Sequence, residues 1–137
     1  MSTNKTLTFC LMDPPYESSN TSTAFRLIEG ALTKGHNVNV FAYEGAVALP
    51  FAKQVQHANA VHGRSLEEEN HPTTKDWVAA LLKKAESAGV KMTWTNCGLC
   101  IDERGVGEAI PGVVRGSPGD LLKAADASIN TLVIGTK

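Results

Sequence analysis

The sequence predicts an α/β fold: a three-layer sandwich with a five-stranded, mainly parallel sheet and helices on both faces. Short apolar runs typical of buried strands alternate along the chain with segments whose apolar residues recur at helical spacing. Strand-helix-strand units of this kind join parallel strands through right-handed crossovers. The length of 137 residues is typical of one domain, so we expect residues 1–137 to form a single domain with one sizeable core.

The first 43 residues contain the first strand, helix and strand. Residues 7–12 form an apolar run that ends at Asp13 and two prolines, as a short buried strand does. A polar stretch with several candidate N-caps follows, and apolar residues then recur at helical spacing from 24 to 32. Gly35 stands where a helix C-terminal cap belongs, and residues 38–43 predict the second strand.

Residues 44–72 are the least regular part of the chain. Residues 46–56 are compatible with a short helix. Residues 57–72 are polar and include an acidic run at 67–69, which is typical of an exposed loop.

Two capping boxes indicate where later helices begin. Thr73 is followed three residues later by Asp76, and Ser117 by Asp120 with proline at the first helical position. Apolar spacing extends the first of these helices to about Gly89. The remaining apolar runs predict a third strand, a brief fourth strand, a helix and a last strand at residues 90–96, 113–114, 121–128 and 131–134.

Charge and composition exclude several classes of function. The 13 basic and 14 acidic residues give a net charge of -1, so we expect no direct nucleic-acid binding. No apolar run approaches the roughly 20 residues that span a bilayer, and residues 1–5 lack the apolar core of a signal peptide. The three cysteines have no framework spacing and suit reduced thiols, so we expect a cytoplasmic protein.

The expected sheet topology predicts that two loops form the ligand-binding crevice. Ligands of open parallel sheets bind beyond the carboxyl ends of the strands, where the strand order reverses. A strand order of 2-1-3-4-5 places that point between the first and third strands. The loops at this expected crevice are residues 13–20 and 96–105.

Cys97 and Cys100 stand in the second of these loops, directly after the third strand. A helical turn starting at Gly98 would place a thiol at the positive end of the helix dipole, which favours the nucleophilic thiolate. Arg104, one to two turns on, would add to this field. We therefore predict that Cys97 is reactive, in a polar surface loop, and that Cys100 takes part, whereas Cys10 is a buried core residue of the first strand.

Other polar side chains of the two loops are candidates for the substrate pocket: Asp13, Tyr16, Asn96 and Arg104. Tyr16 is interpreted as a lid or wall residue. Asp13 is equally compatible with capping the turn at the double proline.

The Cys-x-x-Cys spacing also fits two other interpretations. A zinc site needs about four ligands, and His57, His62 or His71 would have to complete one, at spacings that match no compact metal motif. A thioredoxin-like dithiol would follow the first strand of its fold, not the third. We expect no metal and no cofactor. No glycine-rich phosphate motif or serine-hydrolase motif occurs.

The sequence resembles the DsrE/DsrF-like family of sulfur relay proteins. The resemblance is carried by residues 13–16 (Asp-Pro-Pro-Tyr), the helix through Phe25 and residues 34–41, and by residues 97–106 and 121–134 near the end. Counted back from residues 104–106 (Arg-Gly-Val), Cys97 falls where DsrE- and TusD-type members carry their sulfur-accepting cysteine. TusD-type members lack a partner at the position of Cys100, so a resolving role for that thiol is a feature of this sequence.

The resemblance implies a sulfurtransferase without a cofactor. Cys97 would accept sulfane sulfur as a persulfide and relay it from a donor protein to an acceptor thiol, in sulfur oxidation or in tRNA thiolation. It also implies a homo-oligomer, trimeric or hexameric. Two alternatives remain: a non-catalytic assembly or regulatory subunit of a sulfur-relay complex, and a metal-binding protein that uses the two loop cysteines and a histidine.

Overall fold

A five-stranded sheet forms the middle layer of the computed structural model, which describes residues 5–136 except 57, 59 and 70–71. Every pairing between its strands is parallel. The predicted α/β class is therefore confirmed, and each expected strand is present within two residues of its predicted bounds. The strands are β1 (Thr6–Leu11), β2 (Asn37–Ala42), β3 (Met92–Cys97), β4 (Val113–Gly116) and β5 (Asn130–Ile134).

The order of the strands is β4-β3-β2-β1-β5, and the expected order 2-1-3-4-5 is wrong. After β2 the chain adds β3 to the outer side of β2, and the free edge of β1 is taken by β5. Both orders bury the same apolar runs between the same layers, so hydrophobic patterning cannot distinguish them. The correction separates the loops after β1 and β3, because β2 lies between these strands.

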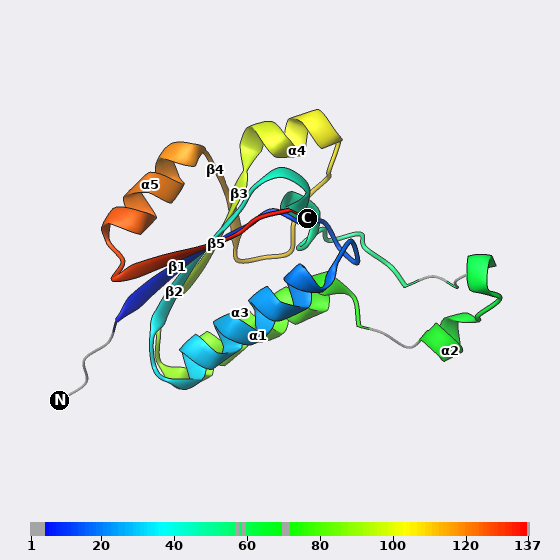
Figure 1. Cartoon of the computed structure of the whole chain (residues 1–137), viewed down its shortest axis with the longest axis horizontal. Helices are drawn as coiled ribbons and strands as arrows, with labels where there is room; N and C mark the ends of the chain where they lie inside the picture. The colour runs from blue at the N-terminus through cyan, green and yellow to red at the C-terminus, as the bar shows by residue number, and fades with distance from the viewer. Residues whose placement is uncertain (1–4, 57, 59, 70–71, 137) are drawn as a thin grey trace.

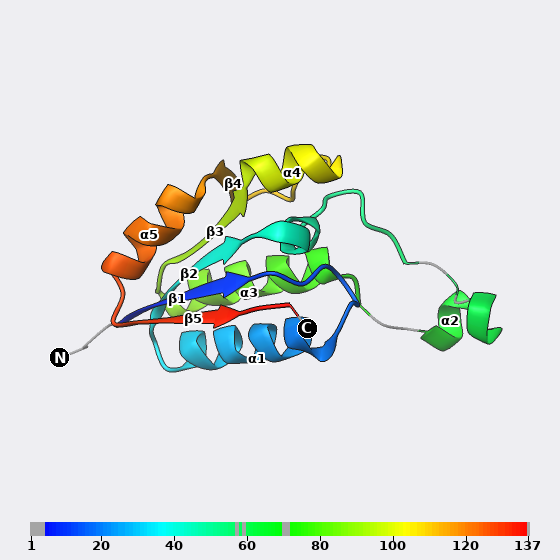
Figure 2. The same ribbon diagram turned by 45° about the horizontal axis from the view of Figure 1, so that its top comes forward.

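Helices cover both faces of the sheet, as expected (Figures 1 and 2). On one face lie α1 (Ser19–Thr33) and α3 (Thr74–Ala88), which pack against each other. On the other face lie α4 (Gly98–Arg104) and α5 (Pro118–Asp126). The result is the predicted three-layer sandwich.

Side chains alternate between the two faces along each strand, and this divides the interior into two clusters. The larger cluster lies under α1 and α3 and contains Phe9, Phe25 and Trp94, with Trp77 packed on Phe25 at 4.8 Å between ring centroids. The smaller cluster lies on the α4 side and contains all three cysteines together with Phe41 and Val47.

Most helix caps form at the residues that the sequence predicts. Ser18 caps α1 by accepting the Asn20 N–H, and the capping box of Ser117 and Asp120 forms as predicted. The box expected at Thr73 does not form, because the Thr73 hydroxyl donates to the Asp76 carboxylate (2.7 Å) instead of accepting from the helix backbone.

The irregular stretch is less helical than expected near its start. Instead of a helix over residues 46–56, a 3-10 helix η1 (Glu44–Ala48) follows β2 directly. The stretch expected as an exposed loop extends away from the sandwich (Figure 1) and carries η2 (Ala60–His62) and α2 (Leu66–Glu69). In the acidic run, Glu67 and Glu68 are exposed as predicted.

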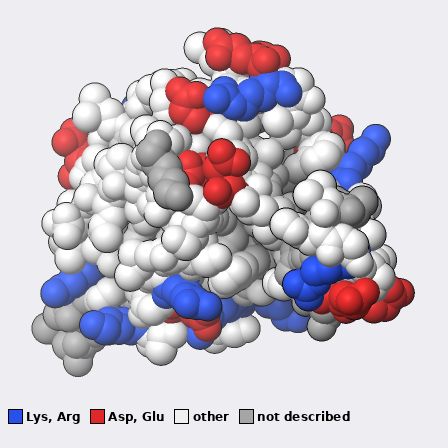
Figure 3. Space-filling model, turned by 45° about the vertical axis from the view of Figure 1, so that its right-hand side comes forward, with Lys and Arg blue, Asp and Glu red and all other residues white. Residues whose placement is uncertain are grey.

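The α4 and α5 side of the sheet is thinly covered. No residue of α5 is buried, and large apolar side chains are exposed on α4, β4, α5 and β5: Leu99, Val114, Leu122 and Val133. On the face of the molecule shown in Figure 3, positive and negative side chains lie next to one another between broad uncharged areas. No helix within the described part of the chain is long and apolar enough to cross a membrane.

Candidate functional site

The cysteine pair stands at the junction of β3 and α4. Cys97 ends the strand and is the N-cap of α4, and Gly98 begins the helix as the sequence predicts. Cys100 is the third residue of the helix, so its side chain lies on the same face of the turn as that of Cys97. The turn thus holds two thiols side by side.

Both thiols are buried, which corrects the expectation that Cys97 lies in a polar surface loop. Cys97 is 1% exposed and Cys100 is 5% exposed. The polar residues that suggested a surface loop, Asp102, Glu103 and Arg104, are exposed. They occupy the outer side of α4 while the thiols face the sheet. Partly buried side chains complete the cover over the pair: Tyr43, Ile101, Val106 and Leu121.

The Cys97 side chain is part of the electrostatic surroundings of the Cys100 thiol. Burial and the hydrogen bond with the Cys97 side chain raise the pKa of Cys100. Cys100 is therefore largely protonated near pH 7.

The backbone amide of Glu44 contacts the thiol of Cys100. Its N–H donates to Cys100 Sγ at 3.2 Å, and this contact opposes the rise in the Cys100 pKa. Glu44 has φ of +53°, a left-handed conformation that costs a non-glycine residue about 1 kcal/mol or more. The Asn96 side chain holds η1 in place by donating to the Val47 carbonyl at 3.2 Å.

Arg115 is the cation next to Cys97, and sequence reasoning missed it. It pairs with Asn96 in the β3–β4 register and lies against Gly98, where an added Cβ would be 2.6 Å from Arg115 Nε. The Asp102 carboxylate holds the guanidinium through two hydrogen bonds of 3.1 and 2.6 Å. These bonds, and the charge of Asp102 and then of Cys97, raise the pKa of Arg115.

A signal for Arg115 exists in the sequence. Parallel strands end at the same edge of a sheet, so a basic residue near the end of β4 must lie beside the residue that ends β3. The apolar pattern predicts a brief strand only at residues 113–114, which ends one residue before Arg115 and leaves this arginine without a role.

Arg104, which was predicted to add to the field at Cys97, contacts Glu44. It is the last residue of α4, and its guanidinium pairs with the Glu44 carboxylate at 2.7 Å. It therefore supports the residue that contacts Cys100. The positive charge next to Cys97 comes from Arg115 on the neighbouring strand.

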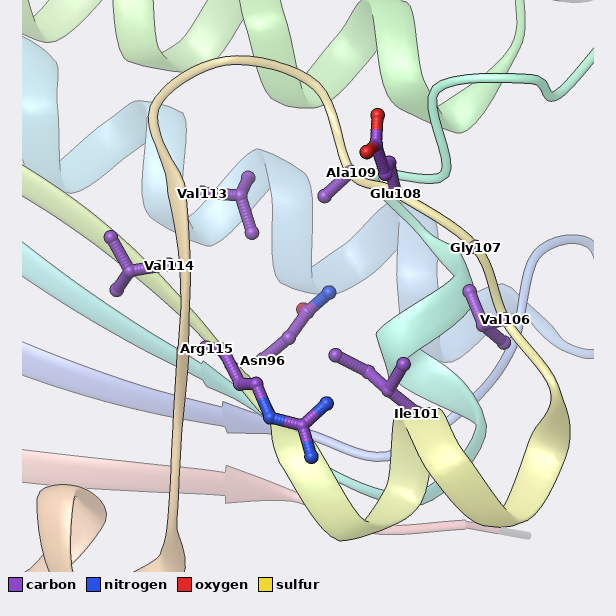
Figure 4. A pocket seen from close by; sticks show the side chains of 9 residues that line it. All are labelled: Asn96, Ile101, Val106, Gly107, Glu108, Ala109, Val113, Val114 and Arg115. Atoms are coloured by element: carbon purple, nitrogen blue, oxygen red, sulfur yellow. The ribbon is translucent and has the colours of Figure 1, made fainter.

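A cavity of about 440 Å³ opens beside the first turn of α4. Arg115 reaches into it from β4, and Ile101 and Val106 form the opposite wall (Figure 4). These two apolar side chains also pack on the thiol cluster, so they separate the cavity from the sulfur atoms. A second cavity, of about 600 Å³, is lined by Glu44 and Arg104 on the Cys100 side.

The loop after β1 contributes fewer residues to the candidate site than expected. Asp13 is buried and accepts hydrogen bonds from Ser18 and Asn20, so it supports the start of α1, the alternative that the sequence left open. Tyr16 is exposed and donates to the Pro72 carbonyl at 2.6 Å, in the segment before α3. Neither residue lines the two cavities beside the thiols.

Asn96 lies next to the thiols, but its side chain is engaged in hydrogen bonds that hold the fold together. It is 2% exposed, and its oxygen accepts the Trp94 indole N–H at 3.0 Å while its amide binds η1. It lines the smaller cavity, yet both ends of its side chain already have partners.

Cys10 is buried, as predicted, but in the same cluster as the loop cysteines. Burial raises its pKa. Within residues 5–136, leaving out the four undescribed positions, no three histidine, cysteine or acidic side chains are arranged to hold a metal ion. Of the histidines considered as zinc ligands, His62 is exposed, and His57 and His71 lie outside the described residues.

Comparison with known proteins identifies a family and shows solved structures with the same fold. The model of the DsrE/DsrF-like family matches residues 5–134, nearly the whole chain. The crystal structure of the ychN protein from E. coli superposes with a TM-score of 0.69 at 17% identity, covering 95% of this chain and 98% of that one. No curated protein matches.

Proposed function

Because the chain belongs to the DsrE/DsrF-like family, we propose that it is a sulfurtransferase that carries sulfane sulfur as a persulfide on Cys97. The observation that carries the proposal is the thiol pair itself. Cys97 lies one helical turn from Cys100 and beside Arg115, whose positive charge favours a sulfur anion at this position. A thiolate is the form that attacks a sulfur donor.

The uptake step is a thiol-persulfide exchange without net oxidation. The Cys97 thiolate attacks the outer sulfur of a donor persulfide and forms a new S–S bond to it. The S–S bond of the donor breaks, and its electron pair leaves with the donor thiolate. Release repeats the exchange: the thiolate of an acceptor attacks the outer sulfur and displaces the Cys97 thiolate. No cofactor takes part in either step.

The other two cysteines are poorer acceptors. The pKa values of both Cys10 and Cys100 are raised, mainly by burial, so each is largely a neutral thiol near pH 7. Cys10 stands inside β1 and contacts neither cavity. The charge environment thus favours loading at Cys97.

The donor and acceptor are proteins or small molecules that carry thiols, and they approach through the side chains covering Cys97. Ile101 and Val106 stand between the cavity beside Arg115 and the sulfur. Displacing these two side chains exposes Cys97 to the cavity. Burial between transfers also keeps water and other thiols from the persulfide.

The working form is a homo-oligomer, a trimer or a hexamer, in a reducing compartment such as the cytoplasm. The motivation is the thin α4–α5 layer, where Leu99, Val114 and Leu122 are exposed. Burying such side chains between copies is favourable at about 25 cal/mol per Å². All three cysteines are free, which suits a reducing compartment.

Loading and discharge together test the proposal. The purified protein is incubated with a sulfane-sulfur donor, separated from it, and weighed intact before and after addition of an acceptor thiol. The proposal requires a gain of one sulfur atom that is then lost to the acceptor. A chain that gains no sulfur, or that keeps it when an acceptor is present, is not a carrier of this kind.

A further inference from the structure

Cys100 lies one helical turn from Cys97, whose Sγ is the sulfur that remains inner after loading. In a persulfide, Cys97 Sγ is the inner sulfur, bonded to Cβ, and the carried sulfur is the outer one. Cys97 is the N-cap of α4 and Cys100 its third residue, and both side chains are buried in the same small cluster. Residues three apart on a helical turn have Cβ atoms about 5–6 Å apart, and a disulfide needs about 4 Å, so a small adjustment of the turn joins the two sulfurs.

A second element fixes Cys100 in this position. The Glu44 N–H donates to Cys100 Sγ from a backbone with positive φ, and the Arg104 guanidinium holds the Glu44 side chain. Strained backbone that is held by its surroundings is concentrated at functional sites. The amide donates to sulfur and therefore stabilises the Cys100 thiolate when it forms.

We propose that the chain has a second activity, which rests on the proposed function: Cys100 attacks the inner sulfur of the Cys97 persulfide and releases the carried sulfur as hydrosulfide. A bond forms between Cys100 Sγ and Cys97 Sγ, and the bond from Cys97 Sγ to the outer sulfur breaks. The electron pair of the broken bond leaves with the outer sulfur. The proton lost by the Cys100 thiol balances the charge, so the products are one disulfide and one hydrogen sulfide.

The electrons for this step come from the two cysteines. The outer sulfur is reduced to sulfide, and the pair of thiols is oxidised to a disulfide between Cys97 and Cys100. A dithiol reductant, small or protein-borne, restores both thiols by exchange. The same persulfide therefore has two outcomes: an acceptor thiol takes the outer sulfur intact, or Cys100 converts it to sulfide.

The experiment separates loading from release. The full chain is loaded with a sulfane-sulfur donor, freed from it by gel filtration, and left without reductant while sulfide and intact mass are followed. The expected result is one sulfide per persulfide and a chain two hydrogens lighter than the reduced protein. Peptide mapping places the disulfide between Cys97 and Cys100, and the rate is independent of protein concentration.

Two different substitutions of Cys100 distinguish loss of the thiol from an effect on folding. Cys100→Ser and Cys100→Ala load normally and release sulfide on the order of a hundredfold more slowly, because only thiols of other protein chains remain to attack. Cys10→Ser, the matched buried cysteine of the same cluster, releases sulfide like the unmodified sequence. Circular dichroism confirms that each variant is folded.

The outcomes distinguish the two proposals. A chain that loads sulfur on Cys97 but forms no disulfide overturns the second activity and leaves the carrier intact. The second activity is overturned in the same way if both Cys100 variants release sulfide at the original rate. If no sulfur loads on Cys97, the carrier proposal itself fails and the second activity fails with it.

Discussion

The guanidinium of Arg115 lies directly against Gly98, the residue that follows Cys97. A Cβ added to Gly98 would be 2.6 Å from Arg115 Nε and 2.8 Å from Cζ. Real Cβ atoms do not approach other atoms so closely, so only glycine at this position allows the cation to lie beside the thiol turn. The side chains of Arg115 and Asp102 are more than half exposed, so their ion pair contributes little to stability.

Gly98→Ala therefore displaces Arg115 from the cysteine turn. We expect sulfur loading of Cys97 to slow by about three- to tenfold, because the cation is partly exposed and its field is screened by water. The rate is measured by intact mass at short times after donor addition. Gly30→Ala is the matched control, since Gly30 is also helical and an added Cβ there meets nothing within 4 Å. Equal loading rates in the two variants would contradict the role given to Arg115.

The sequence predicted most of the fold because local chemistry fixes it. Gly35 and Gly89 have positive φ at the ends of α1 and α3, as their positions indicated, and the capping box at Ser117 forms. The order of the strands could not be predicted. A strand buried on both faces has the same pattern at any place in the sheet, so the crevice expected between β1 and β3 was wrong.

The site was predicted in part. The position of Cys97 at the start of α4 follows from a strand, a glycine and a polar helix. Its burial was not predicted, because the polar residues 102–104 lie on the outer side of the same helix. The contacts from Glu44 and Arg115 depend on packing between segments far apart in the sequence, which local patterns do not encode.

Sulfide release is expected to accelerate with rising pH. Burial keeps the pKa of Cys100 above its ordinary value of 9.0, so near pH 7 the attacking thiol is mostly protonated. Below that pKa, each unit of rising pH therefore increases the thiolate, and with it the rate, by about tenfold. The charged and titratable groups around Cys100 are Cys97, Glu44 with its partner Arg104, Tyr43 and Glu103.

The measurement is the lifetime of the loaded persulfide between about pH 6.5 and about pH 9, without reductant. Cys100→Ser should remove most of the pH dependence, because the ionising nucleophile is then absent. A lifetime that lengthens with rising pH, or a slope retained in this variant, would show that Cys100 is not the group that titrates.

Ile101→Ala should make Cys97 easier to reach. Ile101 is partly buried between the cavity beside Arg115 and the thiol cluster, and truncating it opens a path to the sulfur. We expect alkylation of Cys97 by iodoacetamide to accelerate several-fold and the stability to fall by about 1–2 kcal/mol. Mass mapping of the alkylated peptide and urea denaturation measure the two effects. An unchanged alkylation rate would place the access route elsewhere.

Leu122→Glu should break the proposed oligomer. Leu122 is 67% exposed on α5, and a carboxylate there would be buried without a partner between copies. Light scattering at micromolar concentration should return a mass near 14.6 kDa for this variant and a multiple of it for the unmodified chain. Leu27→Glu on α1, also exposed but on the opposite helical layer, is the control and should leave the mass unchanged. A monomeric unmodified chain would contradict the oligomer.

The position of the carried sulfur is the most direct test of the proposed function. The unmodified chain and the three single variants Cys97→Ser, Cys100→Ser and Cys10→Ser are loaded in parallel, trapped at once with an alkylating reagent and mapped by peptide mass. We predict that only Cys97→Ser fails to gain sulfur, because a serine hydroxyl is not ionised near neutral pH and cannot attack the donor. Loading that persists in Cys97→Ser and disappears in Cys100→Ser or Cys10→Ser would contradict the assignment of Cys97 as the sulfur carrier.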